Sequence, residues 1–218
     1  MKERRIAWMM LILSPLSMAV LFAWVTAGSA PGLGGHSMGY LQATCVVWGI
    51  IMTVVPIFRL IRLVALPLWF LVIMYADMYM FPVTVCLGMY HDIYWWANTT
   101  HVASSMVVAA IILLALCKTA SYCPPHVNLG GKGGTIALMA FLSMSTGAIW
   151  ELMEGFTDII AGSDYMVYGP VNCIGNLSGD FIGTALMVPI AMYIFTKYSV
   201  GEIASKVRLG KKNIDVSR

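Results

Sequence analysis

Charged residues are scarce in this sequence. Lys, Arg, Asp and Glu make up only 11% of the 218 residues, whereas hydrophobic residues make up 60%. Soluble domains carry about 25% charged residues, so the deficit excludes an ordinary soluble protein and places the chain in a lipid bilayer. No polar segment is long enough to form a separate soluble domain. The basic C-terminal stretch "KVRLGKK" is too short to indicate nucleic-acid binding and favours contact with anionic headgroups.

Cysteines and glycine-rich loops offer no metal or phosphate motif. The five cysteines, Cys45, Cys86, Cys117, Cys123 and Cys173, show no CxxC or other metal-ligand spacing. Cys86 and Cys173 could pair on the outer side, although scattered cysteines more often pack in a core. The stretches "SAPGLGGHS" and "NLGGKGG" lack the order of a phosphate-binding loop, so we interpret them as flexible turns.

Long apolar runs make up most of the sequence. A helix needs about 20 apolar residues to cross the hydrocarbon core, and the sequence contains six such runs. They cover approximately Ile6–Ala27, Tyr40–Phe58, Val64–Gly88, Tyr94–Cys117, Thr135–Ile160 and Cys173–Thr196. We therefore predict an all-α, polytopic integral membrane protein with six transmembrane helices.

The basic residues indicate the orientation. With both termini cytoplasmic, all 13 Lys and Arg residues fall on the cytoplasmic side and the outer loops hold none, as the positive-inside rule requires. We predict a six-span bundle over 1–196 and a basic cytoplasmic tail over 197–218. The alternative is that "MKERR" and the first apolar run form a cleaved signal peptide, which would leave five spans.

Several acidic residues lie on the predicted spans without basic partners. No Lys or Arg occurs between Lys132 and Lys197. The acidic residues are joined by one histidine, and the set is Asp77, His101, Glu151, Glu154, Asp158 and Asp180. Charged groups within a bilayer are costly and usually face a bundle interior, so this set is the main candidate for a functional site.

Helical spacing arranges these polar residues into stripes. Glu151, Glu154 and Asp158 follow positions i, i+3 and i+7, which share one helix face. Asn98, His101 and Ser105 repeat that spacing on the preceding span, and Asn176 and Asp180 are i, i+4 on the last. At 1.5 Å per residue, most of these positions lie roughly 9–13 Å in from the outer ends of their spans. We expect them to meet in one layer of the outer leaflet.

Three arrangements would lower the free-energy cost of such a layer of acidic groups within the membrane. The carboxyl groups could be protonated and hydrogen-bonded, could share a bound cation, or could line a wet pocket. A His with carboxylates suits a divalent transition metal, with His101, Glu151 and Asp180 as ligands. The wider predicted binding set is Asn98, His101, Glu151, Glu154, Asn176, Asp180 and Asp77. The opposing interpretation is that polar groups only hold the helices together.

Three segments resemble a known family. The stretches "YWWANTTHVASSMVVAA", "GAIWELMEGFTDIIAGSD" and "NLSGDFIGTALM" are similar to the DUF2238-like family of prokaryotic multi-pass membrane proteins, over roughly residues 94–190. The positions that match its motifs are Asn98, His101, Trp150, Glu151, Glu154, Asn176, Asp180 and Gly183. Ala97 stands where an Asp is common, and Asn176 replaces the first Asp of the last motif. The resemblance implies a shared fold and polar core and names no activity.

These observations lead to three functional hypotheses. The first is a cell-membrane protein, in a prokaryotic plasma membrane, that binds or transports a cation or protons at the acidic–His layer. No span shows the paired breaks typical of secondary transporters, and Gly147 and Gly175 are the nearest candidates. The second is a metal-dependent intramembrane enzyme acting on a lipid-linked substrate, with Glu151 as base beside His101. The third is an accessory subunit that contacts the bilayer and other membrane subunits.

Overall fold

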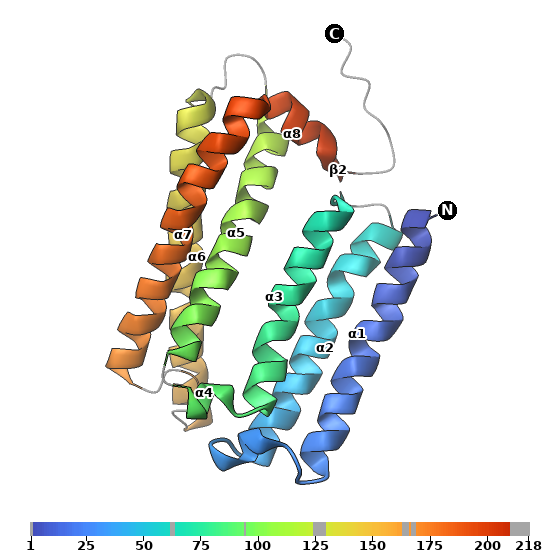
Figure 1. Cartoon of the computed structure of the whole chain (residues 1–218), viewed down its shortest axis with the longest axis vertical. Helices are drawn as coiled ribbons and strands as arrows, with labels where there is room; N and C mark the ends of the chain where they lie inside the picture. Colours follow the sequence, from blue (N-terminus) through green and yellow to red (C-terminus); the bar gives the residue numbers. More distant parts are fainter. Residues whose placement is uncertain are drawn as a thin grey trace. The chain divides into compact units, whose positions relative to one another are not determined.

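The computed structural model describes residues 2–61, 64–93, 95–123, 130–162, 166 and 169–209, and these are almost entirely helical (Figure 1). Six helices in this part are long and apolar enough to cross a membrane, which confirms the all-helical six-span prediction. Two compact units are present, Met1–Asp92 with Lys206–Arg218, and Ile93–Ser205. We call them unit 1 and unit 2 and describe each by itself.

Unit 1 is built from three of the long helices. They are α1 (Lys2–Thr26), α2 (Met38–Leu60) and α3 (Leu68–Cys86), with the 3₁₀ turn η1 (Pro31–Gly34) and the short α4 (Met89–Asp92) between or after them. Polar contacts join helices within the apolar interior: the Tyr75 hydroxyl donates to the Met52 carbonyl at 2.6 Å, and the Ser17 and Tyr79 hydroxyls are 2.8 Å apart. Hydroxyl groups are thus paired inside the unit, as burial in an apolar medium requires.

The third span starts later than its apolar run. We predicted a start at Val64, but α3 begins at Leu68, with Pro67 in the N-cap position. A proline disfavours the helical conformation in the residue before it, so the helix cannot extend back through this point. Instead, β1 (Val64–Ala65) forms a short antiparallel pairing with β2 (Arg208–Leu209). Apolar composition alone therefore overestimated the length of this helix.

The fifth span starts earlier than its apolar run. We interpreted "NLGGKGG" as a flexible turn, but α6 (Gly131–Ala161) includes its last four residues and begins after Gly130, whose φ is 77°. Lys132 in this first turn donates from Nζ to the backbone carbonyl of Phe195, near the end of the last long helix. A tertiary hydrogen bond thus supports a glycine-rich turn that has a low helix propensity.

His36 lies in a buried position between η1 and α2. Only 6% of its surface is exposed, and its ring lies 4.9 Å from that of Tyr40. Burial, together with the nearby His91, lowers the pKa of His36 from its ordinary value. His91 itself contacts the carboxylate of Asp92, with 3.0 Å between Nδ1 and Oδ1. The folded state therefore favours a neutral His36.

We expect this histidine to make the protein less stable in mild acid. The unfolded chain protonates His36 near pH 6.5, whereas the folded state resists protonation, so the unfolded state binds more protons as the pH falls and stability decreases. Thermal unfolding of the full chain in detergent should show a melting temperature that drops by a few degrees below about pH 6.5. In His36→Gln this decrease should be smaller. An identical pH profile in both proteins would contradict the assignment.

Unit 2 contains the other three long helices. They are α5 (Trp96–Ala120), α6, and α7 (Pro170–Lys197), followed by the short α8 (Val200–Lys206). Pro170 occupies the first turn of α7, where its missing N–H costs no hydrogen bond. The helices contact one another in all three combinations. This three-helix arrangement places the polar stripes of the sequence within one unit.

The buried faces of these helices change from apolar to polar along their length. One half forms an apolar cluster of Ala109, Leu113, Cys117, Met139, Met187, Ala191, Phe195 and Ile203. At the transition, the hydroxyls of Ser143 and Thr184 are 2.9 Å apart, and both side chains are buried. The other half carries the acidic residues. Burial of the apolar half stabilises the three-helix bundle. The polar half therefore does not need to supply this stability.

Candidate functional site

The acidic face of α6 points into unit 2. Glu151, Glu154 and Asp158 are all buried, whereas Leu152 and Phe156 between them are 61% and 62% exposed. This is the reverse of a helix in a soluble protein, where apolar residues occupy the buried face. The pattern is favourable when the exposed face contacts lipid and the polar face contacts other helices. The i, i+3, i+7 spacing of the carboxylates therefore defines an inward-facing polar stripe.

His101 lies between two carboxylates from different helices. Its Nδ1 is 3.2 Å from Oδ1 of Asp180 on α7, and its Nε2 is 3.8 Å from Oε1 of Glu151 on α6. Ser105, one turn along α5 from His101, donates a hydrogen bond of 2.5 Å to the same Asp180 oxygen. All three helices thus contribute to one cluster, which we call the His101 cluster: His101, Ser105, Glu151 and Asp180.

The cluster contains buried oxygen atoms without hydrogen bonds. Among the described residues, these include both carboxylate oxygens of Glu151, Oδ2 of Asp180 and Oδ1 of the adjacent Asn176. Glu151 and Asp180 are 5% and 4% exposed, so water gives little compensation. The thiol of Cys173 on α7 also interacts with Glu151, but a thiol is a weak donor. An ionised carboxylate in this environment is unfavourable unless a cation joins it.

The other two acids of α6 have hydrogen-bond donors of their own. Trp150 Nε1 donates to Oε1 of Glu154 at 2.7 Å. Asp158 accepts the backbone N–H of Met166 at 3.0 and 3.2 Å and is buried. Both contacts are local, within or next to α6. Glu154 and Asp158 therefore differ from Glu151, whose oxygens face the other helices.

Glycines allow α5 and α7 to approach closely. A Cβ added to Gly179 would lie 2.8 Å from the Asn98 carbonyl oxygen and 2.9 Å from Cβ of His101. One added to Gly175 would lie 2.9 Å from Oδ1 of Asn98, and one added to Gly183 would meet the Val102 carbonyl oxygen. Small residues at four-residue intervals permit such contacts between membrane helices. This spacing allows the α5 backbone near His101 to lie close to the α7 backbone near Asp180.

Gly147 has the same role on α6. A Cβ at this position would lie 2.8 Å from Cγ of Asp180, so the absence of a side chain leaves room for the carboxylate. We considered Gly147 and Gly175 as candidates for helix breaks, but α6 and α7 run continuously through them. Their function in the fold is close packing.

Sequence reasoning missed these packing glycines and one side chain. The repeat Gly175-x₃-Gly179-x₃-Gly183 is visible in the sequence and is a known signal of close helix contact. Cys173, interpreted as core packing or as a partner of Cys86, interacts with Glu151. Its position relative to Asn176 and Asp180, i, i+3 and i+7, places it on the same helix face and was the signal available.

Two parts of the predicted site stay predictions. Asp77 belongs to α3 of unit 1, where it is half-buried, so its place in the binding set stays a prediction. In the described part of the chain, no three His, Cys, Asp or Glu side chains are arranged to hold a metal ion. The proposed metal ligands His101, Glu151 and Asp180 therefore also stay a prediction. Asn98 lies against Gly175 and Gly179 of α7, and Asn176 is one helical turn before Asp180 on α7.

The hydroxyl of Ser105 donates to a carboxylate oxygen of Asp180 and not to a ring nitrogen of His101, so these residues differ from a Ser-His-Asp triad, in which the serine donates to the imidazole. The two ring nitrogens of His101 face different carboxylates, an arrangement that can hold and exchange a proton.

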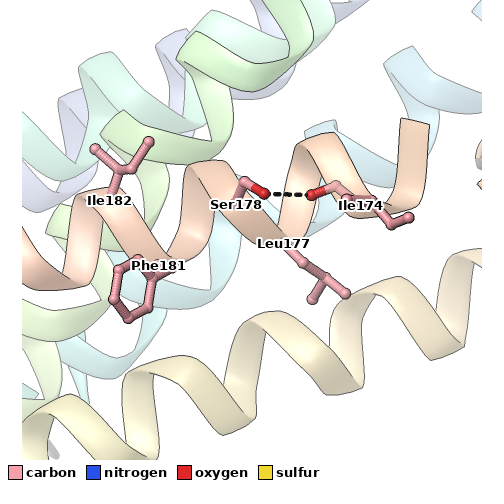
Figure 2. A pocket seen from close by; sticks show the side chains of 5 residues that line it. All are labelled: Ile174, Leu177, Ser178, Phe181 and Ile182. Atoms are coloured by element: carbon pink, nitrogen blue, oxygen red, sulfur yellow. Dashed lines mark hydrogen bonds between the residues drawn. The ribbon is translucent and has the colours of Figure 1, made fainter. Parts of the chain in front are cut away.

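An apolar hollow on α7 is separate from this cluster. Figure 2 shows its lining residues, Ile174, Leu177, Ser178, Phe181 and Ile182. The only polar side chain among them, Ser178, donates to the Ile174 carbonyl of its own helix at 2.7 Å. The hollow contains no acid or histidine, and we interpret it as part of the surface that contacts acyl chains.

Comparison with protein families identifies a family for this chain. A family model described as a predicted membrane protein family, DUF2238, matches residues 10–197. The matched region is longer than the 94–190 segment on which the sequence resemblance was based, and it includes most of both units. No curated protein and no solved structure matches the chain.

Proposed function

Since this chain belongs to the DUF2238 family of predicted membrane proteins, a description that names no reaction, we propose its function from the site itself: the His101 cluster binds a cation, and that cation is a proton. The observation that carries the proposal is Glu151, a buried carboxylate with neither oxygen hydrogen-bonded among the described residues. A proton converts this group from a costly anion into a neutral acid.

The geometry indicates how the proton is shared. Asp180 accepts one hydrogen bond from Ser105, and its Oδ1 lies 3.2 Å from Nδ1 of His101. The opposite ring nitrogen faces Glu151 at 3.8 Å, a distance that a small side-chain rotation would reduce to a hydrogen bond. A proton added at either carboxylate is therefore exchangeable through the imidazole, which carries a donor or acceptor on each side.

The charge distribution supports an outward-facing site. With both termini in the cytoplasm, as the positions of Lys and Arg favour, the polar half of unit 2 lies in the outer leaflet of the cell membrane. The apolar half, with Leu113 and Met187 in its cluster, then separates the site from the inner surface. We propose proton binding from the outer side.

Carbodiimide labelling tests the proposal, because these apolar reagents modify protonated carboxyl groups within membranes. In proteoliposomes of the full chain, we expect dicyclohexylcarbodiimide to label Glu151, with less labelling as the pH is raised. Glu151→Gln should lose this label. Glu154→Gln is the matched control, since Glu154 is bonded to Trp150, and it should keep the label at Glu151.

Two results would contradict the proton assignment. One is the absence of label at Glu151 at every pH in a protein that is folded by thermal unfolding. The other is protection by added Zn²⁺ or Mn²⁺ with no effect of pH, which would favour a metal ion bound by the same side chains. A purely structural role predicts that Glu151→Gln lowers the melting temperature and that wild-type labelling does not depend on pH.

A further inference from the structure

Unit 1 contains a pair of cysteines on neighbouring helices. Cys45 lies in the first half of α2 and Cys86 is the last residue of α3. Their Sγ atoms are 3.9 Å apart although 41 positions separate them in the chain. Both are free thiols and are essentially fully buried, in an apolar cluster with Val25, Leu41 and Val85.

The two sulfurs lie near enough for a disulfide to form after a local adjustment. An S–S bond is about 2.05 Å long, so the sulfurs, at 3.9 Å, need to approach by roughly 2 Å. The backbone at Cys86 is at a helix end: Leu87 is the C-cap and Gly88 follows with φ of 77°. The end of a helix adjusts more readily than its middle, so closure does not require a helix to unwind.

The surroundings restrict which oxidants reach the thiols. The turn η1 packs against the end of α3 so closely that a Cβ added to Gly32 would lie 3.1 Å from the Cys86 carbonyl oxygen. A large disulfide-carrying protein cannot reach thiols that are buried in this way, so the oxidant to consider is a small uncharged molecule such as hydrogen peroxide.

We propose that Cys45 and Cys86 form a reversible disulfide when the protein meets hydrogen peroxide. The sulfur of one thiol attacks a peroxide oxygen, the O–O bond breaks, and a sulfenic acid and one water form. The second sulfur attacks the sulfenic sulfur, the S–S bond forms, and a second water leaves with the remaining thiol proton. The two sulfurs lose two electrons and the peroxide is reduced to two waters. The bond joins α2 to α3, and a dithiol reductant restores both thiols.

Peptide mapping of the full chain tests this assignment. The purified protein is treated with hydrogen peroxide, denatured, alkylated and digested without reductant. We expect a cross-linked Cys45–Cys86 peptide that has lost two hydrogen atoms, that disappears after dithiothreitol, and that accompanies a higher melting temperature. Cys117 supplies the matched control, because it is equally buried but lies in the apolar cluster of unit 2. Cys117→Ser should leave the cross-link unchanged, and Cys45→Ser should abolish it.

Peptide mapping of the wild-type protein tests the proposed disulfide even if a variant fails to fold. Recovery of Cys45 and Cys86 as separately alkylated thiols after peroxide, or as separate sulfinic acids, would overturn the proposal. A cross-link between Cys86 and Cys173 in place of Cys45–Cys86 would overturn it as well. The outcome does not depend on proton binding at the His101 cluster, which uses neither Cys45 nor Cys86.

Discussion

Gly183→Ala is expected to destabilise the protein by about 1–3 kcal/mol, the range for overpacking a well-packed core. The added methyl group would meet the backbone carbonyl oxygen of Val102 and would lie 3.0 Å from Cβ of Ser105. A backbone carbonyl cannot rotate away as a flexible side chain does, so α5 and α7 must separate. Separation also moves Asp180 away from Ser105 and His101, which adds lost hydrogen bonds to the steric cost.

The measurement is unfolding of the full chain in mixed micelles, by heat and by titration with sodium dodecyl sulfate. Gly133→Ala is the matched control, because Gly133 lies within α6 and a Cβ there meets nothing within 4 Å. Alanine is favoured over glycine in a helix by about 1 kcal/mol, so this variant should be unchanged or more stable. Equal effects of the two substitutions would show that α5 and α7 do not pack through Gly183.

Asp180→Ala is expected to disrupt the His101 cluster and to lower stability by about 1–3 kcal/mol, the cost of leaving a buried hydrogen-bonding group unsatisfied. Asp180 is the acceptor for Ser105 Oγ at 2.5 Å and faces His101 Nδ1 at 3.2 Å. Without it, the imidazole loses the contact that orients it toward Glu151. Carbodiimide labelling of Glu151 should therefore change along with the melting temperature.

Ser178→Ala provides the comparison on the same helix. The Ser178 hydroxyl is exposed and donates to the carbonyl of Ile174 within α7 (Figure 2), so its removal should alter neither stability nor labelling. Asp180→Asn keeps the shape but removes the charge, and it should preserve more stability than Asp180→Ala. Normal labelling and stability in Asp180→Ala would show that Asp180 does not support the cluster.

The shape of the acidic stripe was predictable from residue spacing. Glu151, Glu154 and Asp158 share a helix face because 3.6 residues complete each turn, and all three are buried. The spacing gave no information on partners. Glu154 and Asp158 find donors close in sequence, Trp150 and Met166. Glu151 faces His101, fifty positions earlier in the chain. This pairing depends on how α5 and α6 are rotated relative to each other.

The positions of the helix ends were also only partly predictable from the sequence. The apolar run from Val64 predicted a third span, but Pro67 delays its start to Leu68. The glycines before Thr135 predicted a turn, yet α6 includes them, and Lys132 bonds to a carbonyl of α7. Local propensity is worth only fractions of a kcal/mol per residue, so a single tertiary contact can decide where a helix begins.

The sequence by itself determined that this protein is a six-helix membrane protein with an acidic stripe and a histidine on its spans. Hydrophobic length and helical periodicity are local properties, and both can be counted along the chain. The tertiary structure decided that His101 lies between Asp180 and Glu151, and that Cys45 lies beside Cys86. These pairings depend on the distance and rotation between helices, which close contacts such as those at Gly179 and Gly183 set, and no single helix contains that information.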